Sequence, residues 1–172
     1  MRNEFDITKK DVLYGVDKLV ESYISVIKVD LPYYDSVNGI AEKIDGKPMI
    51  FGLNTDAKHL QPNDNVTAQI FFYEHDSRKA IGRNFETELS CVVWFNQVRL
   101  EGYGTRIRER LIHELMNVFR GEDLVEMQYF DTFQIFTERS QVFTDFEVNE
   151  KILKSPFDGF RIRFKTKYLN EC

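Results

Sequence analysis

The sequence predicts one α+β domain over residues 1–172, in which an antiparallel β-sheet carries two amphipathic helices on one face. Two stretches place apolar residues at helical spacing, and three others alternate apolar with polar residues. A chain of 172 residues is long enough to bury a sizeable core within one domain. Neither a linker nor an internal repeat divides it, so we expect a single domain.

Composition argues against several classes of protein. Charged residues make up 30% and hydrophobic residues 42% of the chain, which is typical of neither a disordered nor a membrane protein. The longest clear apolar run, from Cys91 to Phe95, is strand-sized, and no secretion signal opens the sequence. We therefore expect a protein that folds in a cytoplasm without a membrane partner. The net charge of -5 argues against binding nucleic acid through overall charge.

The first predicted element is a helix at about residues 8–27. Thr8 is suited to cap its N-terminus, with Asp11 three residues later. One apolar stripe runs along it and consists of Val12, Val16, Leu19, Val20, Tyr23 and Ile27.

A turn-rich stretch, 30–65, follows the first helix. Within it, Asp45-Gly46 joins segments 41–44 and 47–51 as a predicted β-hairpin. Pro48 lacks a backbone N–H, so we expect this hairpin at an edge of the sheet.

Three strands are predicted by alternation, at residues 66–73, 85–96 and 160–168. Their core-facing side is expected to present Val66, Ala68, Ile70, Phe72, Phe85, Leu89, Cys91, Val93, Phe95, Phe160, Ile162, Phe164 and Tyr168. Between the second and third strands, residues 105–120 predict the second helix. Its apolar stripe is Ile107, Leu111, Leu115, Val118 and Phe119.

Residues 125–143 have a mixed apolar pattern, which predicts a long, bent or bulged strand. Residues 144–156 predict an excursion with one helical turn around Glu150. This excursion and the 30–65 stretch are either loops or arms that reach neighbouring subunits.

The side of the strands opposite the predicted core is the most informative feature of the sequence. It presents Phe71, Tyr73, Val92 and Trp94, which two helices on the other face cannot cover. A monomer rarely leaves a large contiguous apolar patch in water. Either the N-terminal hairpin folds over this side, or another subunit does. In the second case these residues form a protein interface, and Trp94→Glu is expected to weaken assembly and leave the fold intact.

The last strand carries a basic stripe on the same side: Arg161, Arg163, Lys165 and Lys167. One interpretation is a solvated strand face on which Arg161 and Arg163 pair across strands with Glu86 or Glu88. The other is contact with an acidic neighbour or with passing DNA, which adds these four residues to the predicted interface.

No catalytic constellation is recognisable, and we expect neither an enzyme nor a metal or cofactor site. No Gly-x-Ser-x-Gly turn is present, and Cys91 lies within an apolar strand, which favours a packed thiol. Glu74, His75 and Asp76 are strand neighbours that point to opposite sides, which suits a metal poorly. His113 falls on the polar side of the second helix.

Residues 66–169 resemble the tail-terminator and tail-completion proteins of tailed bacteriophages. The resemblance is one of element order. It rests on the strand 85–96 (FETELSCVVWFN), the helix 105–120, the long strand 129–143 and the closing strand 160–168. Related folds are expected in neck rings of short-tailed phages, including the crAss-like phages of gut Bacteroides.

The resemblance implies a structural virion protein that forms a homo-oligomeric ring at a phage neck, head-tail connector or tail. Its partners would be further copies and the neighbouring neck, portal or tail proteins. It would assemble in the host cytoplasm, and DNA would pass through the lumen without specific binding. The alternative is a bacterial adaptor or ligand-binding domain that works as a monomer or dimer.

Overall fold

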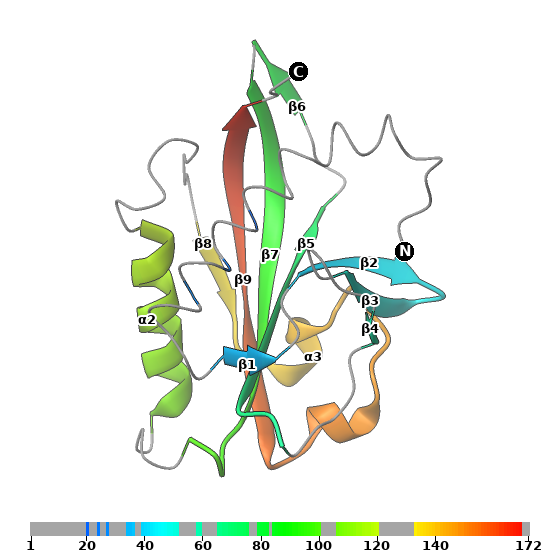
Figure 1. Ribbon diagram of the computed structural model, residues 1–172, viewed down its shortest axis with the longest axis vertical. Helices are drawn as coiled ribbons and strands as arrows, with labels where there is room; N and C mark the ends of the chain where they lie inside the picture. The colour runs from blue at the N-terminus through cyan, green and yellow to red at the C-terminus, as the bar shows by residue number, and fades with distance from the viewer. Residues whose placement is uncertain are drawn as a thin grey trace.

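The computed structural model describes residues 20, 24, 27, 34–36, 39–51, 58–59, 65–75, 79–82, 84–100, 106–120 and 133–169. Their strands form one nine-stranded sheet in the order β4-β3-β2-β5-β7-β9-β8, with β1 beside β5 and β6 beside β7 (Figure 1). The strands are β1 (Tyr34–Ser36), β2 (Ile40–Ile44), β3 (Lys47–Phe51), β4 (Lys58–His59), β5 (Ala68–Glu74), β6 (Lys79–Ile81), β7 (Asn84–Asn96), β8 (Phe133–Phe136) and β9 (Phe157–Leu169). Besides the helical positions Val20, Ile24 and Ile27, the described helical elements are α2 (Ile107–Arg120), α3 (Arg139–Val142) and the 3-10 turn η3 (Glu150–Leu153). The predicted α+β class is confirmed.

The central ladder of the sheet consists of β7 and β9. These two 13-residue strands pair antiparallel along their whole length. Successive side chains of a strand point to opposite sides, so the ladder has two faces. We call the face that bears Val93 the first face and the face that bears Trp94 the second face.

Helix α2 packs into the core on the first face, and it lies beside β8 at that end of the sheet (Figure 1). Its residues Leu111, Leu115 and Phe119 are fully buried, and the Phe119 ring lies 6.2 Å from that of Phe72 and 5.2 Å from that of Phe164. Burying one such side chain stabilises the fold by about 1.5–3 kcal/mol. The sheet supplies Ala68, Ile70, Phe72, Leu89, Cys91, Val93, Phe95, Phe160, Ile162 and Phe164 to this core, as the alternation predicts.

The first predicted helix contributes to the same core. Val20, Ile24 and Ile27 are its described positions; all three are helical and buried in the cluster that contains α2. The remaining residues of that predicted helix lie outside the described residues. Over the part of the chain that is described, both predicted helices therefore pack on the first face.

The predicted hairpin forms as β2 and β3. Asp45 and Gly46 have φ angles of 51° and 78°, as the two central positions of a type I′ turn require. The edge position expected from Pro48 is only partly correct, because β4 extends the sheet beyond β3. β4 pairs only with Met49 and Ile50, so Pro48 lies outside that pairing and its missing N–H costs nothing there.

The sheet is mixed rather than wholly antiparallel. β1 and β2 each pair with β5 in parallel, whereas β5, β7, β9 and β8 form consecutive antiparallel pairs. The parallel pairing of β2 is short, with Ile40 opposite Phe72. The hairpin therefore pairs with β5 at the start of β2, and the rest of β2 extends past β5.

The long strand predicted at 125–143 is only partly correct over its described residues. The strand is β8, which ends at Phe136, and α3 begins at Arg139. Two arginines fix the change of direction: Arg108 donates to the Thr137 carbonyl oxygen, and Arg139 donates to the carbonyl oxygens of Leu153 and Phe157. Residues 125–132 of the prediction lie outside the described residues.

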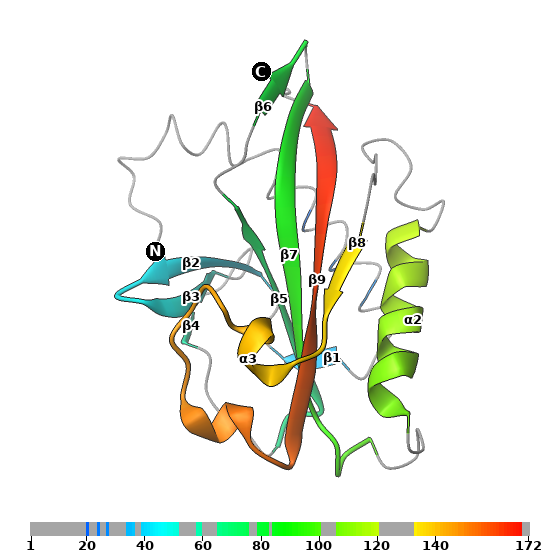
Figure 2. The ribbon, with the colours of Figure 1, turned by 180° about the vertical axis from the view of Figure 1, so that it is seen from behind.

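Residues 137–156, which we call the strap, cross the second face (Figure 2). The strap contains α3 and η3, and η3 confirms the helical turn predicted around Glu150. Its apolar residues close a second core made of Ala41, Phe71, Tyr73, Val92, Trp94, Val142, Phe143, Ile152 and Phe157, with Phe146, Val148 and Leu153 packed against it. The excursion predicted at 144–156 thus packs on the sheet of its own chain.

The strap corrects both expectations for the second face. Phe71, Tyr73, Val92 and Trp94 are 1%, 5%, 0% and 2% exposed, so neither the hairpin alone nor a second subunit is needed to cover them. Trp94 stacks edge-on against Phe143 of the strap, with ring centroids 5.0 Å apart. Trp94→Glu would place a charge in the core and no longer tests assembly.

Gly159 is required by the position of Trp94. The two residues face each other on β7 and β9, and the indole lies directly over the glycine backbone. A Cβ atom at position 159 would lie 1.9 Å from Cε3 of Trp94 and 2.5 Å from the Val93 carbonyl oxygen. The absence of a side chain at Gly159 therefore lets the largest ring of the second core pack directly against β9.

We expect Gly159→Ala to lower the free energy of unfolding by about 1–3 kcal/mol, because the indole must move to admit the methyl group. Urea denaturation measures this change. Lys165→Ala is the matched control, since Lys165 is exposed on the same strand and its loss should change stability by less than about 0.5 kcal/mol. Equal stabilities of the two variants would contradict the packing described for Trp94.

Candidate functional site

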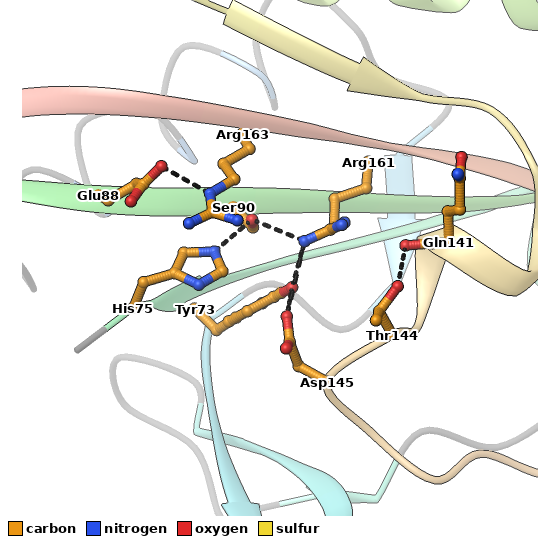
Figure 3. A network of polar contacts seen from close by, with 9 residues as sticks. All are labelled: Tyr73, His75, Glu88, Ser90, Gln141, Thr144, Asp145, Arg161 and Arg163. Carbon is orange, nitrogen blue, oxygen red and sulfur yellow. Dashed lines mark hydrogen bonds and ion pairs between the residues drawn. The ribbon is translucent and has the colours of Figure 1, made fainter. Parts of the chain in front are cut away.

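A network of polar side chains lies on the second face beside the strap (Figure 3). β5 and the residue after it supply Tyr73 and His75, β7 supplies Glu88 and Ser90, and β9 supplies Arg161 and Arg163. Asp145 comes from the strap. The register brings the sheet residues together, because Ser90 lies opposite both Tyr73 on β5 and Arg163 on β9.

Arg161 is the centre of this network. It is 4% exposed, and its Nη1 atom donates to the hydroxyl of Tyr73 at 3.0 Å and to that of Ser90 at 3.5 Å. Asp145 lies 3.6 Å from the same nitrogen, and the guanidinium lies over the Phe136 ring at 4.1 Å. A buried cation is costly unless it is paired and hydrogen-bonded. Nη1 of Arg161 meets this requirement through these contacts, whereas the buried Nε atom has no hydrogen-bond partner among the described residues.

Tyr73 joins the strap to the sheet. Its hydroxyl donates to Oδ2 of Asp145 at 2.6 Å while it accepts from Arg161. Burial, with the hydrogen bond to Asp145, raises the pKa of Tyr73 to about 12. The phenol therefore stays protonated at neutral pH and remains a donor to Asp145.

His75 and Ser90 form a close pair, with Nε2 of His75 2.7 Å from Oγ of Ser90. Burial and the nearby charge of Arg163 lower the pKa of His75, so its ring is neutral at pH 7. A hydroxyl beside an imidazole suggests a hydrolase nucleophile and base. Ser90, however, is fully buried in mid-strand and also accepts from Arg161, so a substrate cannot reach its oxygen in this structure.

Arg163 bonds to Glu88, with Nε 2.6 Å from Oε1. The hydrogen bond to Glu88 raises the pKa of Arg163 further. This contact confirms the predicted cross-strand pairing for Arg163. For Arg161 the prediction is wrong, because its partners are Tyr73, Ser90 and Asp145 in place of a glutamate.

The predicted interface of eight residues is thus largely internal. Phe71, Val92 and Trp94 lie in the second core, and Tyr73 and Arg161 lie in the buried network. Arg163 is partly exposed and paired, and Lys165 is exposed. The side chain of Lys167 lies outside the described residues. The sequence reasoning missed Asp145 and Ser90, although the apolar residues of 142–157 were a signal that this segment packs on the sheet.

The described residues outside this network include few other candidates for a metal site or a reactive group. No group of three or more His, Cys, Asp or Glu side chains in this part of the chain is arranged to hold a metal ion. Burial raises the pKa of the Cys91 thiol, which packs in the first core as predicted. His113 is exposed on α2, also as predicted. Within the described ranges, no helix has the length and apolar character to cross a membrane.

A scan against protein-family models finds no matching family, and a search of curated proteins finds no significant match.

Tyr73→Phe tests whether the network stabilises the strap. The substitution keeps the ring in the second core but removes the hydroxyl that accepts from Arg161 and donates to Asp145. We expect a loss of about 1–3 kcal/mol in the free energy of unfolding, because buried charged and polar groups lose a partner. Glu150→Gln is the control, since Glu150 forms an exposed strap ion pair with Lys154 at 3.9 Å that contributes little. Denaturation curves that coincide for both variants would show that the network adds no stability.

The lowered pKa of His75 predicts a pH dependence. An unfolded histidine binds a proton near pH 6.5, whereas folded His75 does so only at lower pH. The free energy of unfolding should therefore be constant above about pH 6.5 for this group and fall as the pH drops toward the folded pKa. His75→Asn should reduce this dependence in urea denaturation measured across that range. His113→Asn, which changes an exposed histidine, should retain it; equal slopes for the two variants would count against the assignment.

Proposed function

We propose that this chain is a ring-forming structural subunit of a bacteriophage neck, head-tail connector or tail. Part of the support is the order β5, β6, β7, α2, β8, α3, η3, β9, in which helix α2 lies between the β5–β7 pair and the β8–β9 pair. This order is similar to the arrangement expected from the resemblance to tail-terminator and tail-completion proteins, except that the short strand β8 and helix α3 replace the described part of the long strand expected at 129–143. A fold alone does not define a function, so the proposal needs support from the surface.

The observation that carries the proposal is that the central strands β5, β7 and β9 are covered on both faces, and that the described sheet ends in two unlike edges. Helix α2 covers the first face, and the strap covers the second. Among the described strands, β4 lies at one end of the sheet order and β8 at the other. A ring subunit contacts its two neighbours through two different surfaces, and two different edges at opposite ends meet this requirement.

The charges are compatible with a lumen through which DNA passes without specific binding. The chain has a net charge of -5. Two cations of the basic stripe, Arg161 and Arg163, contact Asp145 and Glu88 of the same chain. Phosphate binding depends on cations that are available to release counterions, and these two are already paired.

Assembly of the purified chain tests the proposal. We expect size-exclusion chromatography with light scattering to show a closed oligomer whose population rises with concentration, and negative-stain electron microscopy to show rings. Portal and tail proteins of the same phage should be added if the chain alone remains small. A strict monomer at high concentration that also fails to assemble with those proteins would overturn the proposal.

A further inference from the structure

The positive charge of Arg161 is only partly compensated within the chain. Its side chain is 5% exposed, and the hydrogen bonds that it donates go to two neutral hydroxyl groups, those of Tyr73 and Ser90. The Asp145 carboxylate lies 3.6 Å from Nη1, which is an ion pair beyond hydrogen-bond distance. The buried Nε atom has no hydrogen-bond partner among the described residues. A desolvated guanidinium in this state favours a further anionic acceptor.

Other groups around Arg161 also favour an anion (Figure 3). The Tyr73 hydroxyl donates at 2.6 Å toward the position where the Asp145 oxygen lies, and its pKa of about 12 keeps the proton on the phenol at neutral pH. Arg163 projects from the same face of β9 two residues further on, although it is bonded to Glu88. The sheet therefore holds a fixed donor and two cations around one point.

Asp145 fills the surface end of this arrangement. Its side chain is 45% exposed, and its contacts with both Tyr73 and Arg161 are made through one oxygen, Oδ2. It comes from the part of the strap between α3 and η3, where residues 143–148 form no helix or strand. The rings of Phe143 and Phe146 hold this segment on the sheet. Rotation of the Asp145 side chain alone would therefore uncover the donors without detaching the strap.

We propose that Arg161 and Tyr73 form an oxyanion-binding site that accepts a carboxylate or phosphate group, with Asp145 as its gate. A ligand oxygen takes the place of Oδ2 and accepts from the Tyr73 hydroxyl and from Nη1 of Arg161. Guanidinium groups suit both ligand classes, because their planar donors match carboxylate and phosphate oxygens. All of these groups belong to one chain, so the site does not depend on the proposed ring.

Removal of the competing carboxylate tests this site. Wild type and Asp145→Ala are unfolded with urea at neutral pH in sodium phosphate or sodium acetate, and in sodium chloride of equal ionic strength. A ligand that binds the folded chain raises the free energy of unfolding in a saturable way. We expect saturation by phosphate or acetate in both proteins, at a concentration about tenfold or more lower in Asp145→Ala than in wild type. The anion that saturates identifies the ligand class.

Glu147→Ala is the matched control, because it removes an exposed carboxylate two residues further along the same segment. Phosphate stabilises proteins generally through its exclusion from their surface, and this control measures that effect. Tyr73→Phe in the Asp145→Ala background should raise the saturating concentration about tenfold, because the ligand loses a donor. If Asp145→Ala does not fold, Asp145→Asn takes its place, since it keeps an acceptor for Tyr73 without the charge.

Two results would overturn the inference. One is a response of the Asp145 variant that equals that of Glu147→Ala. The other is a wild-type chain that shows no saturable response to phosphate or acetate over the range that saturates the variant. Neither result bears on ring assembly, which light scattering measures separately.

Discussion

The structure depends on a central ladder in which the middle of strand β7 is apolar on both sides. β7 places Cys91 and Val93 on the first face and Val92 and Trp94 on the second, and all four side chains are buried. Such a ladder is unstable with one face in water, because the apolar area on both sides must be removed from solvent. Two separate coverings follow: a long helix on one side, and on the other a strap of short turns.

The strap differs from the helix in how it is held. Helix α2 covers its face through a regular stripe of apolar residues at helical spacing. The strap has one four-residue helix and one 3-10 turn, so aromatic contacts and a buried polar network position it. Phe143 lies against Trp94, and Asp145 contacts Tyr73 and Arg161. Arg139 donates hydrogen bonds to two backbone carbonyl oxygens near the start of β9. These contacts place the carboxylate of Asp145 beside the buried guanidinium of Arg161 on β9.

Much of the fold was predictable because its signals are local. Alternation in 85–96 and 160–168, the stripe of α2, and the Asp45-Gly46 turn each specify an element within a dozen or so residues. The parallel pairing of β2 with β5 was missed, because strand pairing between distant segments has no local signature. The end of β8 was missed for a similar reason: Arg108 and Arg139 turn the chain through bonds to distant carbonyl groups.

The residues of the candidate site could be predicted from the sequence only in part. The residues of the second face were identified, and so was the possibility that Arg163 pairs with Glu88. Their role was misjudged, because a pattern shows that a face is apolar without showing what covers it. The covering segment carries Val142, Phe143, Phe146 and Ile152 at irregular spacing, which matches neither a helix nor a strand. Asp145 joins the network solely because this irregular segment folds back.

The glycine beneath the indole has a consequence for the history of the sequence. Positions 94 and 159 share one volume, so a side chain at 159 is compatible only with a smaller residue at 94. Substitutions at the two positions should therefore have been accepted together during divergence. Tryptophan with glycine would be one permitted combination, and a small aliphatic residue with alanine or a larger residue would be another. Related chains, once aligned, would show this as covariation between two strands that are neighbours in the sheet and 65 positions apart in the sequence (159 − 94).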